Sequence, residues 1–307
     1  MQEGSKKAIV AAFIANLGIA IAKLVGFFFT RSAGLLAEAG HSMADTSNQA
    51  LLLLGGRRAA RAADEDNPFG FGRERYFWAF VVALVLFSMG GLFALYEGIQ
   101  KLIDPHETEN LPIAIGILVM AIGLETFSLR TAVREANHVK PKEMGWWEFV
   151  RTSKSPELPV VLLEDIGAEI GLFLALAGVG LAAITHDPRW DAIGSIAIGI
   201  LLIVIGIVLA IETKGLLVGE RAGTAAEEAI RAAITDHPTV RNLIHLRTQH
   251  IGPDVLLVGA KIEFVNEFDT ARLAEAVDAV EKSIRAVEPS ARWVYLEPDL
   301  LRSAGGT

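Results

Sequence analysis

The sequence contains no cysteine among its 307 residues. This absence excludes a disulfide-stabilised scaffold and any zinc site built on thiolates, so metal chemistry would have to use histidine and carboxylate side chains. Positive charge is also scarce, because 28 Lys and Arg stand against 36 Asp and Glu, giving a formal net charge of −8. A nucleic-acid-binding domain normally carries a basic patch. We therefore expect no nucleic-acid partner.

Aromatic residues make up only 7% of the chain, whereas 52% of the residues are hydrophobic and the mean hydropathy is +0.41. This composition is too apolar for a soluble globular protein and predicts several membrane-spanning helices. One crossing needs about 20 mostly apolar residues. The first such stretch is too long for the core of a signal peptide, and we interpret it as a retained helix. Six stretches qualify: 8–29, 33–55, 77–98, 111–131, 158–185 and 192–213.

The loops between these stretches differ in positive charge, which predicts their orientation because cytoplasmic loops collect Lys and Arg. The opposite loops carry one basic residue each, namely Arg31, Lys101 and Arg189. Both termini are therefore predicted to be cytoplasmic, in the inner (plasma) membrane if the source is bacterial. The basic loops contain Arg57, Arg58, Arg61, Arg73 and Arg75 after the second stretch, and Arg134, Lys140, Lys142, Arg151 and Lys154 after the fourth.

The C-terminal part of the chain has the amphipathic character of a small soluble domain. We predict an α-helical transmembrane domain over residues 1–215 and a cytoplasmic domain over 216–307. The order of elements in the second domain, αββαβ, is typical of a two-layer α+β fold of the ferredoxin-like kind, with helices on one face of a sheet. The predicted elements are a helix at 224–235, strands at 243–250 and 255–264, a helix at 270–287 and a strand at 292–296.

The second apolar stretch contains three ionisable residues, Glu38, His41 and Asp45. A charged group at membrane depth costs at least about 2.5 kcal/mol, so each of them is a functional candidate. Their spacing of i, i+3 and i+7 places them along one stripe of a helix. His41 and Asp45 form an i, i+4 pair that can offer one nitrogen and one oxygen to a single cation.

The fifth stretch supplies Glu164, Asp165 and Glu169. Asp165 and Glu169 share a helical face, whereas Glu164 lies about 100° away from Asp165 on a period of 3.6 residues. Both sets of carboxylates fall at similar depths. One imidazole with several carboxylates suits a divalent first-row metal such as zinc, cobalt, manganese or iron. The residues favour a metal or proton pathway, and the alternative is a purely structural polar cluster.

Other polar groups in the apolar stretches give a weaker signal. Asn16, Lys23 and Glu125 are interpreted as partners in hydrogen bonds between helices or as snorkelling groups. The acidic run at 64–66 reads as a solvated loop, with metal capture as the minor alternative. The glycines of Asn67–Gly72 follow no strand and lack a Lys-Ser/Thr ending, so they predict turns and not a phosphate-binding loop.

The sequence resembles the cation diffusion facilitator family, which exports divalent metal from the cytoplasm in exchange for protons. His41-Ser42-Met43-Ala44-Asp45 matches the HxxxD motif of that family, and Asp165 matches its aspartate on the fifth helix. The resemblance extends over six helices followed by a cytoplasmic αββαβ domain, from about residue 8 to 299. The segments 72–78 and 247–253 resemble the branch that includes animal mitochondrial zinc transporters.

The chain departs from the family pattern at the fourth metal ligand. Many members carry His or Asp four residues before the aspartate of the fifth helix, where this chain has Val161. We expect Glu169 to supply the missing ligand, and Glu164, Asn16 or water are the alternatives. The metal site is thus predicted to be His41, Asp45, Asp165 and Glu169.

Accessory metal sites of the family are not expected here. Asn67 and Phe71 stand where members with a loop site carry histidine, and Ile244, Lys261 and Tyr295 stand at the histidine positions of the soluble domain. His245 and His250 lie nearby and are interpreted as ordinary surface residues of the sheet.

The resemblance implies a homodimer in the lipid bilayer that couples efflux of divalent cations to protons. Zinc is the first choice of substrate, with cobalt, manganese, iron or cadmium as alternatives, and no prosthetic group or enzymatic activity is expected. Two other hypotheses compete. In one, the chain is a membrane-tethered metal sensor or interaction protein. In the other, it is a membrane metallo-hydrolase, for which we find no separate catalytic base and oxyanion donor.

Overall fold

The computed structural model describes residues 3–108, 110–265 and 268–301, with side chains from Asn16 onward. The chain divides into two compact units. The first comprises the chain up to Arg58 together with Phe77–Lys214, and the second comprises Ala59–Tyr76 together with the chain from Gly215 onward. Each unit has its own hydrophobic core.

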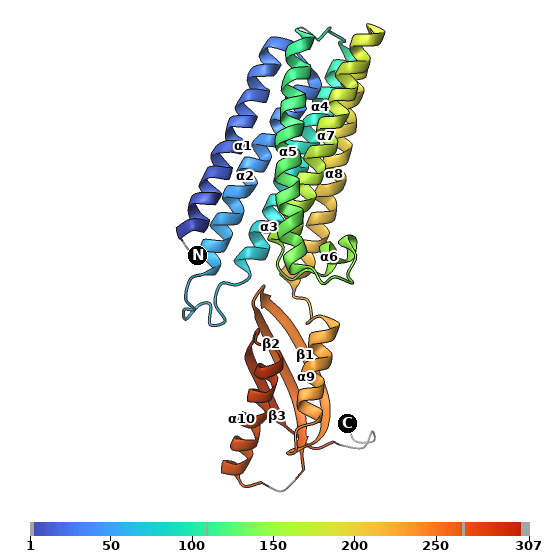
Figure 1. Cartoon of the computed structure of the whole chain (residues 1–307). Coiled ribbons are helices and arrows are strands. Elements are labelled where there is room, and N and C mark those ends of the chain that lie inside the picture. The colour runs from blue at the N-terminus through green and yellow to red at the C-terminus, as the bar shows by residue number, and fades with distance from the viewer. Residues whose placement is uncertain (1–2, 109, 266–267, 302–307) are drawn as a thin grey trace. The chain divides into compact units, whose positions relative to one another are not determined.

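The first unit is a bundle of long helices (Figure 1). All six predicted apolar stretches lie within helices, the third of them in the continuous run α3–η1–α4. Within that run, η1 is a π-helical segment in which the backbone is locally wider than in an α-helix. The elements are α1 (Glu3–Thr30), α2 (Ala33–Ala59), α3 (Glu74–Val85), η1 (Leu86–Leu92), α4 (Phe93–Ile103), α5 (Leu111–Val139), α6 (Trp146–Thr152), α7 (Glu157–Thr185) and α8 (Arg189–Val218).

Four helical segments of the described chain are long and apolar enough to cross a membrane, which identifies an integral membrane protein. The part of α1 with described side chains adds a shorter apolar helix, Asn16–Thr30. The α2 helix has 27 residues, but its polar stripe lowers its hydropathy. Six crossings therefore remain a prediction. The four segments are Glu74–Ile103, Leu111–Val139, Glu157–Thr185 and Arg189–Val218.

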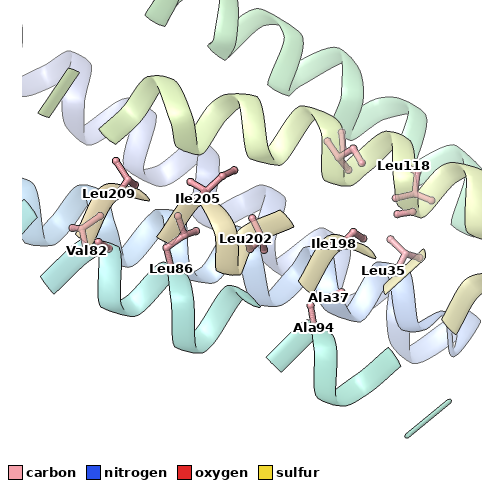
Figure 2. Packing of buried hydrophobic residues seen from close by; sticks show 14 of the residues in the cluster. Leu35, Ala37, Val82, Leu86, Ala94, Leu118, Ile198, Leu202, Ile205 and Leu209 are labelled. Carbon is pink, nitrogen blue, oxygen red and sulfur yellow. The ribbon is translucent and has the colours of Figure 1, made fainter. Parts of the chain in front are cut away.

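The core of the bundle is formed by aliphatic side chains from five segments of the chain (Figure 2). Leu35 and Ala37 come from α2, and Leu118 comes from α5. A row of side chains along α8 runs through the centre of this core and contacts α7 and the run from α3 to α4. The ionisable residues of α2 lie on the buried face of that helix. The α8 row is Ile198, Leu202, Ile205 and Leu209.

Glycine allows α8 to approach the run from η1 to α4 closely. A Cβ atom added at Gly199 would lie 2.6 Å from the backbone nitrogen of Leu95 and 2.9 Å from the carbonyl oxygen of Gly91. Small residues at such crossings let helices in a membrane pack backbone against backbone. Because both neighbours are backbone atoms, the contact cannot be relieved by a side-chain rotation.

We predict that Gly199→Ala destabilises the bundle by about 1–3 kcal/mol, because the extra methyl group forces the two backbones apart. Thermal unfolding of the purified full chain in detergent measures this effect. Gly116→Ala in α5 is the matched control, since an added Cβ there meets nothing within 4 Å. Equal unfolding midpoints for the two variants would contradict the packing described here.

The second unit contains a small α+β fold with the element order α–β–β–α–β. Its sheet has the order β1-β2-β3, with β1 antiparallel to β2 and β2 parallel to β3. Both helices pack on one face of the sheet around side chains such as Ile230, Val258 and Val280. The bounds are α9 (Thr224–Thr235), β1 (Val240–Gly252), β2 (Val255–Phe264), α10 (Thr270–Val287) and β3 (Ala291–Pro298).

The loop between α2 and α3 belongs to the second unit and packs on its sheet. The ring of Phe69 meets the ring of Trp293 edge to face, with centroids 5.3 Å apart. Arg75 Nη1 forms an ion pair with Asp254 Oδ2 at 3.1 Å. The loop and the C-terminal domain therefore fold as one body.

Candidate metal site

The polar stripe of α2 is buried in the first unit. Glu38 and His41 are fully buried and Asp45 is 8% exposed. His41 Nδ1 lies 3.5 Å from Asp45 Oδ1, as expected for residues one helical turn apart. Next to the imidazole, the π-helical segment carries Gly90, where an added Cβ would lie 3.8 Å from His41 Nδ1. The stripe predicted from the sequence is thus an inward-facing feature of the helix.

Several polar atoms of this stripe lack hydrogen-bond partners within the described part of the chain. They include both ring nitrogens of His41 and Oδ1 of Asp45. A buried polar atom without a partner costs about 1–3 kcal/mol, and native structures hold few of them. An imidazole nitrogen and a carboxylate oxygen that lie close together without hydrogen-bond partners can bind a metal cation or accept a proton.

On α7, Glu164 is the carboxylate that faces α2. It is 5% exposed, and its Oε1 accepts a hydrogen bond from Asn48 Nδ2 at 2.9 Å. Its carboxyl group also interacts directly with that of Asp45. Asn48 is not among the residues predicted from the sequence, although its place at i+3 from Asp45 on the same stripe is a usable signal.

Asp165 and Glu169 face α5. Asp165 Oδ2 accepts a hydrogen bond from Ser128 Oγ at 3.1 Å, and Glu169 Oε1 accepts one from Thr126 Oγ1 at 2.8 Å. The second oxygen of Glu169 is buried without a partner among the described residues. The shared face of Asp165 and Glu169 and the separate direction of Glu164 agree with the helical period.

A crevice too narrow to hold a water molecule lies beside Asp45 between three helices. Asn16 and Ile19 line it from α1, Ser42 and Asp45 from α2, and Glu125 from α5. In the sequence, Asn16 and Glu125 carry only a weak signal. Their place in the crevice adds one amide and one carboxylate to the surroundings of Asp45.

The predicted ligands are not gathered into one coordination sphere. Across the described residues, no three His, Asp or Glu side chains stand close enough to hold one ion. The helices hold His41 and Asp45 together on α2, and Asp165 and Glu169 together against α5. The two pairs are therefore described as separate groups, and a shared metal site stays a prediction.

Outside the bundle, the turns predicted before α3 are confirmed, because Gly70 N donates to the Asn67 carbonyl at 2.9 Å and Glu74 N to the Phe71 carbonyl at 3.0 Å. The same loop holds a further local contact. Asp64 Oδ1 accepts hydrogen bonds from the backbone and the side-chain nitrogen of Asn67, at 2.8 and 3.0 Å. The side-chain hydrogen bond from Asn67 is the main reason that the pKa of Asp64 lies below its usual value.

In the sheet, His245 pairs in register with Lys261 and is exposed. His250 is only 7% exposed, so the prediction that both histidines are surface residues is wrong for His250.

Comparison with known families decides the assignment. A family model described as the cation efflux transmembrane domain matches residues 9–218, more than half of the chain. This chain belongs to the cation efflux family. The resemblance to cation diffusion facilitators predicted from the HxxxD motif and Asp165 is thereby confirmed.

Named relatives of this cation efflux protein include transporters of several organisms. The proton-coupled zinc antiporter SLC30A9, mitochondrial, of Xenopus laevis is 30% identical over 289 residues, which are 93% of this chain and 52% of the relative. Metal tolerance protein C4 of Arabidopsis thaliana is 27% identical over 261 residues, covering 85% and 57%. The zinc transporter ZitB of Pectobacterium atrosepticum is 27% identical over 254 residues, covering 82% and 73%. The chain spans about half the length of the SLC30A9 relatives.

Proposed function

We propose that this cation efflux protein exports divalent metal cations in exchange for protons, with zinc as the main substrate. The observation that carries the proposal is the buried His41–Asp45 pair with its open nitrogen and oxygen atoms. Such a pair is unfavourable in a structural role, because its atoms lose water without gaining partners. It is suited to a ligand that enters, loses its own water and leaves again.

The proposed ligands are His41 and Asp45 of α2 and Asp165 and Glu169 of α7. Glu169 keeps one buried oxygen open, which a metal ion can use. We assign Glu164 a positioning role, because it holds Asn48 and contacts the Asp45 carboxyl group. One imidazole and three carboxylates suit zinc and other first-row divalent ions.

Proton coupling follows from the chemistry of these ligands. A metal ion binds neutral imidazole and ionised carboxylates, so metal entry releases protons and protonation releases metal. Histidine is the side chain that most readily changes charge near neutral pH. An opposing flow of protons through the same groups would therefore drive the metal in one direction.

Our topological proposal is six crossings with both termini in the cytoplasm and two copies per transporter. The basic loop after α2 and the C-terminal domain fold as one body, which supports placing both on the same side of the membrane. The positive charge of that loop supports the cytoplasmic side. The homodimer is proposed from the family resemblance.

Metal uptake by proteoliposomes tests this function. Purified full-length chain is reconstituted, and entry of zinc, cobalt, manganese, iron and cadmium is followed with an entrapped indicator under an outward proton gradient. We expect zinc entry that depends on the gradient and is absent from Asp45→Asn vesicles. A membrane-tethered sensor would bind metal without transporting it, and that result would reject the proposal.

The two carboxylates of α7 with different assigned roles give a direct comparison. We expect Glu169→Gln to weaken zinc binding by about tenfold or more, equivalent to at least about 1.4 kcal/mol, because it removes a charged ligand. Glu164→Gln should have a smaller effect, since the glutamine oxygen can still accept the hydrogen bond from Asn48. Zinc titration of both variants at one pH measures the difference. If Glu169→Gln binds zinc as tightly as the wild type and Glu164→Gln binds it much more weakly, the two assigned roles are wrong and must be exchanged.

A further inference from the structure

A lysine is buried beside the polar stripe of α2. Lys23 of α1 is 1% exposed, and its Nζ donates hydrogen bonds to Glu38 Oε2 at 3.1 Å and to Ser42 Oγ at 2.8 Å. Ser42 is the sequence neighbour of His41. From the sequence, Lys23 could either snorkel or form a hydrogen bond to another helix. Because Lys23 is buried and bonded to α2, the second interpretation is the correct one.

The two carboxylate oxygens of Glu38 face different helices. Lys23 binds one carboxylate oxygen, and the other oxygen points at Gly171 of α7, where an added Cβ would lie 2.6 Å from it. That second oxygen has no hydrogen-bond partner within the described residues. Glu38 lies one turn from His41 on the same stripe, on the side of the turn that joins α1 to α2. Without Lys23, it would be a further free carboxylate next to the proposed metal ligands.

Stability does not explain this ion pair. Burying two charges costs several kcal/mol of solvation per ion, and replacing such a pair by apolar residues is often neutral or stabilising. An ammonium group beside a cation-binding stripe also repels the cation. The pair therefore fits a role in setting where and how tightly a cation binds.

We infer that Lys23 is a built-in counter-ion that keeps Glu38 out of the metal's coordination sphere and confines the metal to the His41–Asp45 end of the stripe. The inference rests on the proposed function and makes Lys23 a positioning residue. A transporter must release its substrate, and an additional free carboxylate would hold the metal too tightly. Lys23 limits the negative charge that the metal meets.

Three variants of the full chain test this role through opposite changes in zinc affinity. Lys23→Met frees Glu38, and we expect the zinc dissociation constant to fall at least tenfold. Glu38→Gln leaves the ammonium group uncompensated, and the constant should rise at least tenfold. The double variant removes both charges and should return within threefold of the wild type. A purely structural contact would instead weaken binding in both single variants.

The experiment is zinc titration of protein in lipid nanodiscs, with folding checked by thermal unfolding and gel filtration. A folded Lys23→Met variant that binds zinc no more tightly than the wild type overturns the inference. If Lys23→Met does not fold, a Glu38→Gln variant that binds zinc with wild-type affinity overturns the inference equally. If the wild type binds zinc and His41→Ala does not, the proposed metal site stands whatever the outcome for Lys23, and the uptake assay tests transport separately. Absence of zinc binding by the wild type rejects both.

Discussion

Replacing Asp45 with asparagine is expected to abolish metal transport while the protein still folds and inserts. The change keeps the shape of the side chain and removes the charge that a dication needs. His41→Ala should be equally severe, because it removes the one imidazole of the α2 stripe. Both side chains are buried with open atoms, so few alternative donors can replace them.

Zinc uptake into proteoliposomes measures this loss, with reconstituted protein quantified in each preparation. Asp104→Asn is the matched control, because it makes the same chemical change at an exposed residue beyond the end of α4. Wild-type uptake by Asp45→Asn or His41→Ala would contradict the site assignment. If zinc uptake falls equally in the Asp104→Asn control, the loss in the other variants does not come from the metal site.

The second large effect is expected at Asp191, a fully buried residue near the start of α8. Its carboxylate accepts hydrogen bonds from Ser32 Oγ and from the backbone nitrogens of Ala33 and Gly34, at 3.0, 3.0 and 3.1 Å. It thereby caps the first turn of α2 from another helix. Its Oδ2, which also accepts the bond from Ala33, pairs with Lys101 Nζ at 2.7 Å.

Asp191→Asn leaves the Lys101 ammonium buried without its counter-charge. Breaking a buried pair in this way typically costs about 3–5 kcal/mol, so we expect a large fall in the midpoint of thermal unfolding. Lys101→Met combined with Asp191→Asn should be less destabilised than the single variant. Asp187→Asn is the control, because the Asp187 side chain accepts a local hydrogen bond from the Arg189 backbone. A midpoint for Asp191→Asn equal to that of the control would mean that this network does not stabilise α2.

Hydrophobic patterning was sufficient to locate most elements of this fold. Apolar runs and breaks predicted where helices occur in the first unit, and the predicted helices at 224–235 and 270–287 coincide with α9 and α10. The strands β1 and β3 are longer than predicted, because their ends are fixed by pairing with β2 and not by local pattern. Pairing depends on residues distant in sequence, which periodicity cannot report.

The site was predictable along each helix but not between helices. The spacing of His41 and Asp45 fixes their shared face on α2, and the period of α7 separates Glu164 from Asp165. Which of these faces meets α2 and which meets α5 depends on packing of the whole bundle. The sequence also gave no sign of the π-helical segment or of the pair between Lys101 and Asp191, whose partners are 90 residues apart.

The measurement that tests the account most directly follows zinc and protons together in the same proteoliposomes. An entrapped zinc indicator and an entrapped pH indicator report both fluxes after zinc is added outside. We expect zinc entry accompanied by proton exit, seen as a rise in internal pH, with both signals lost in Asp45→Asn vesicles. Zinc entry without any proton movement, or equal signals from wild-type and Asp45→Asn vesicles, would contradict the exchange of metal for protons at this site.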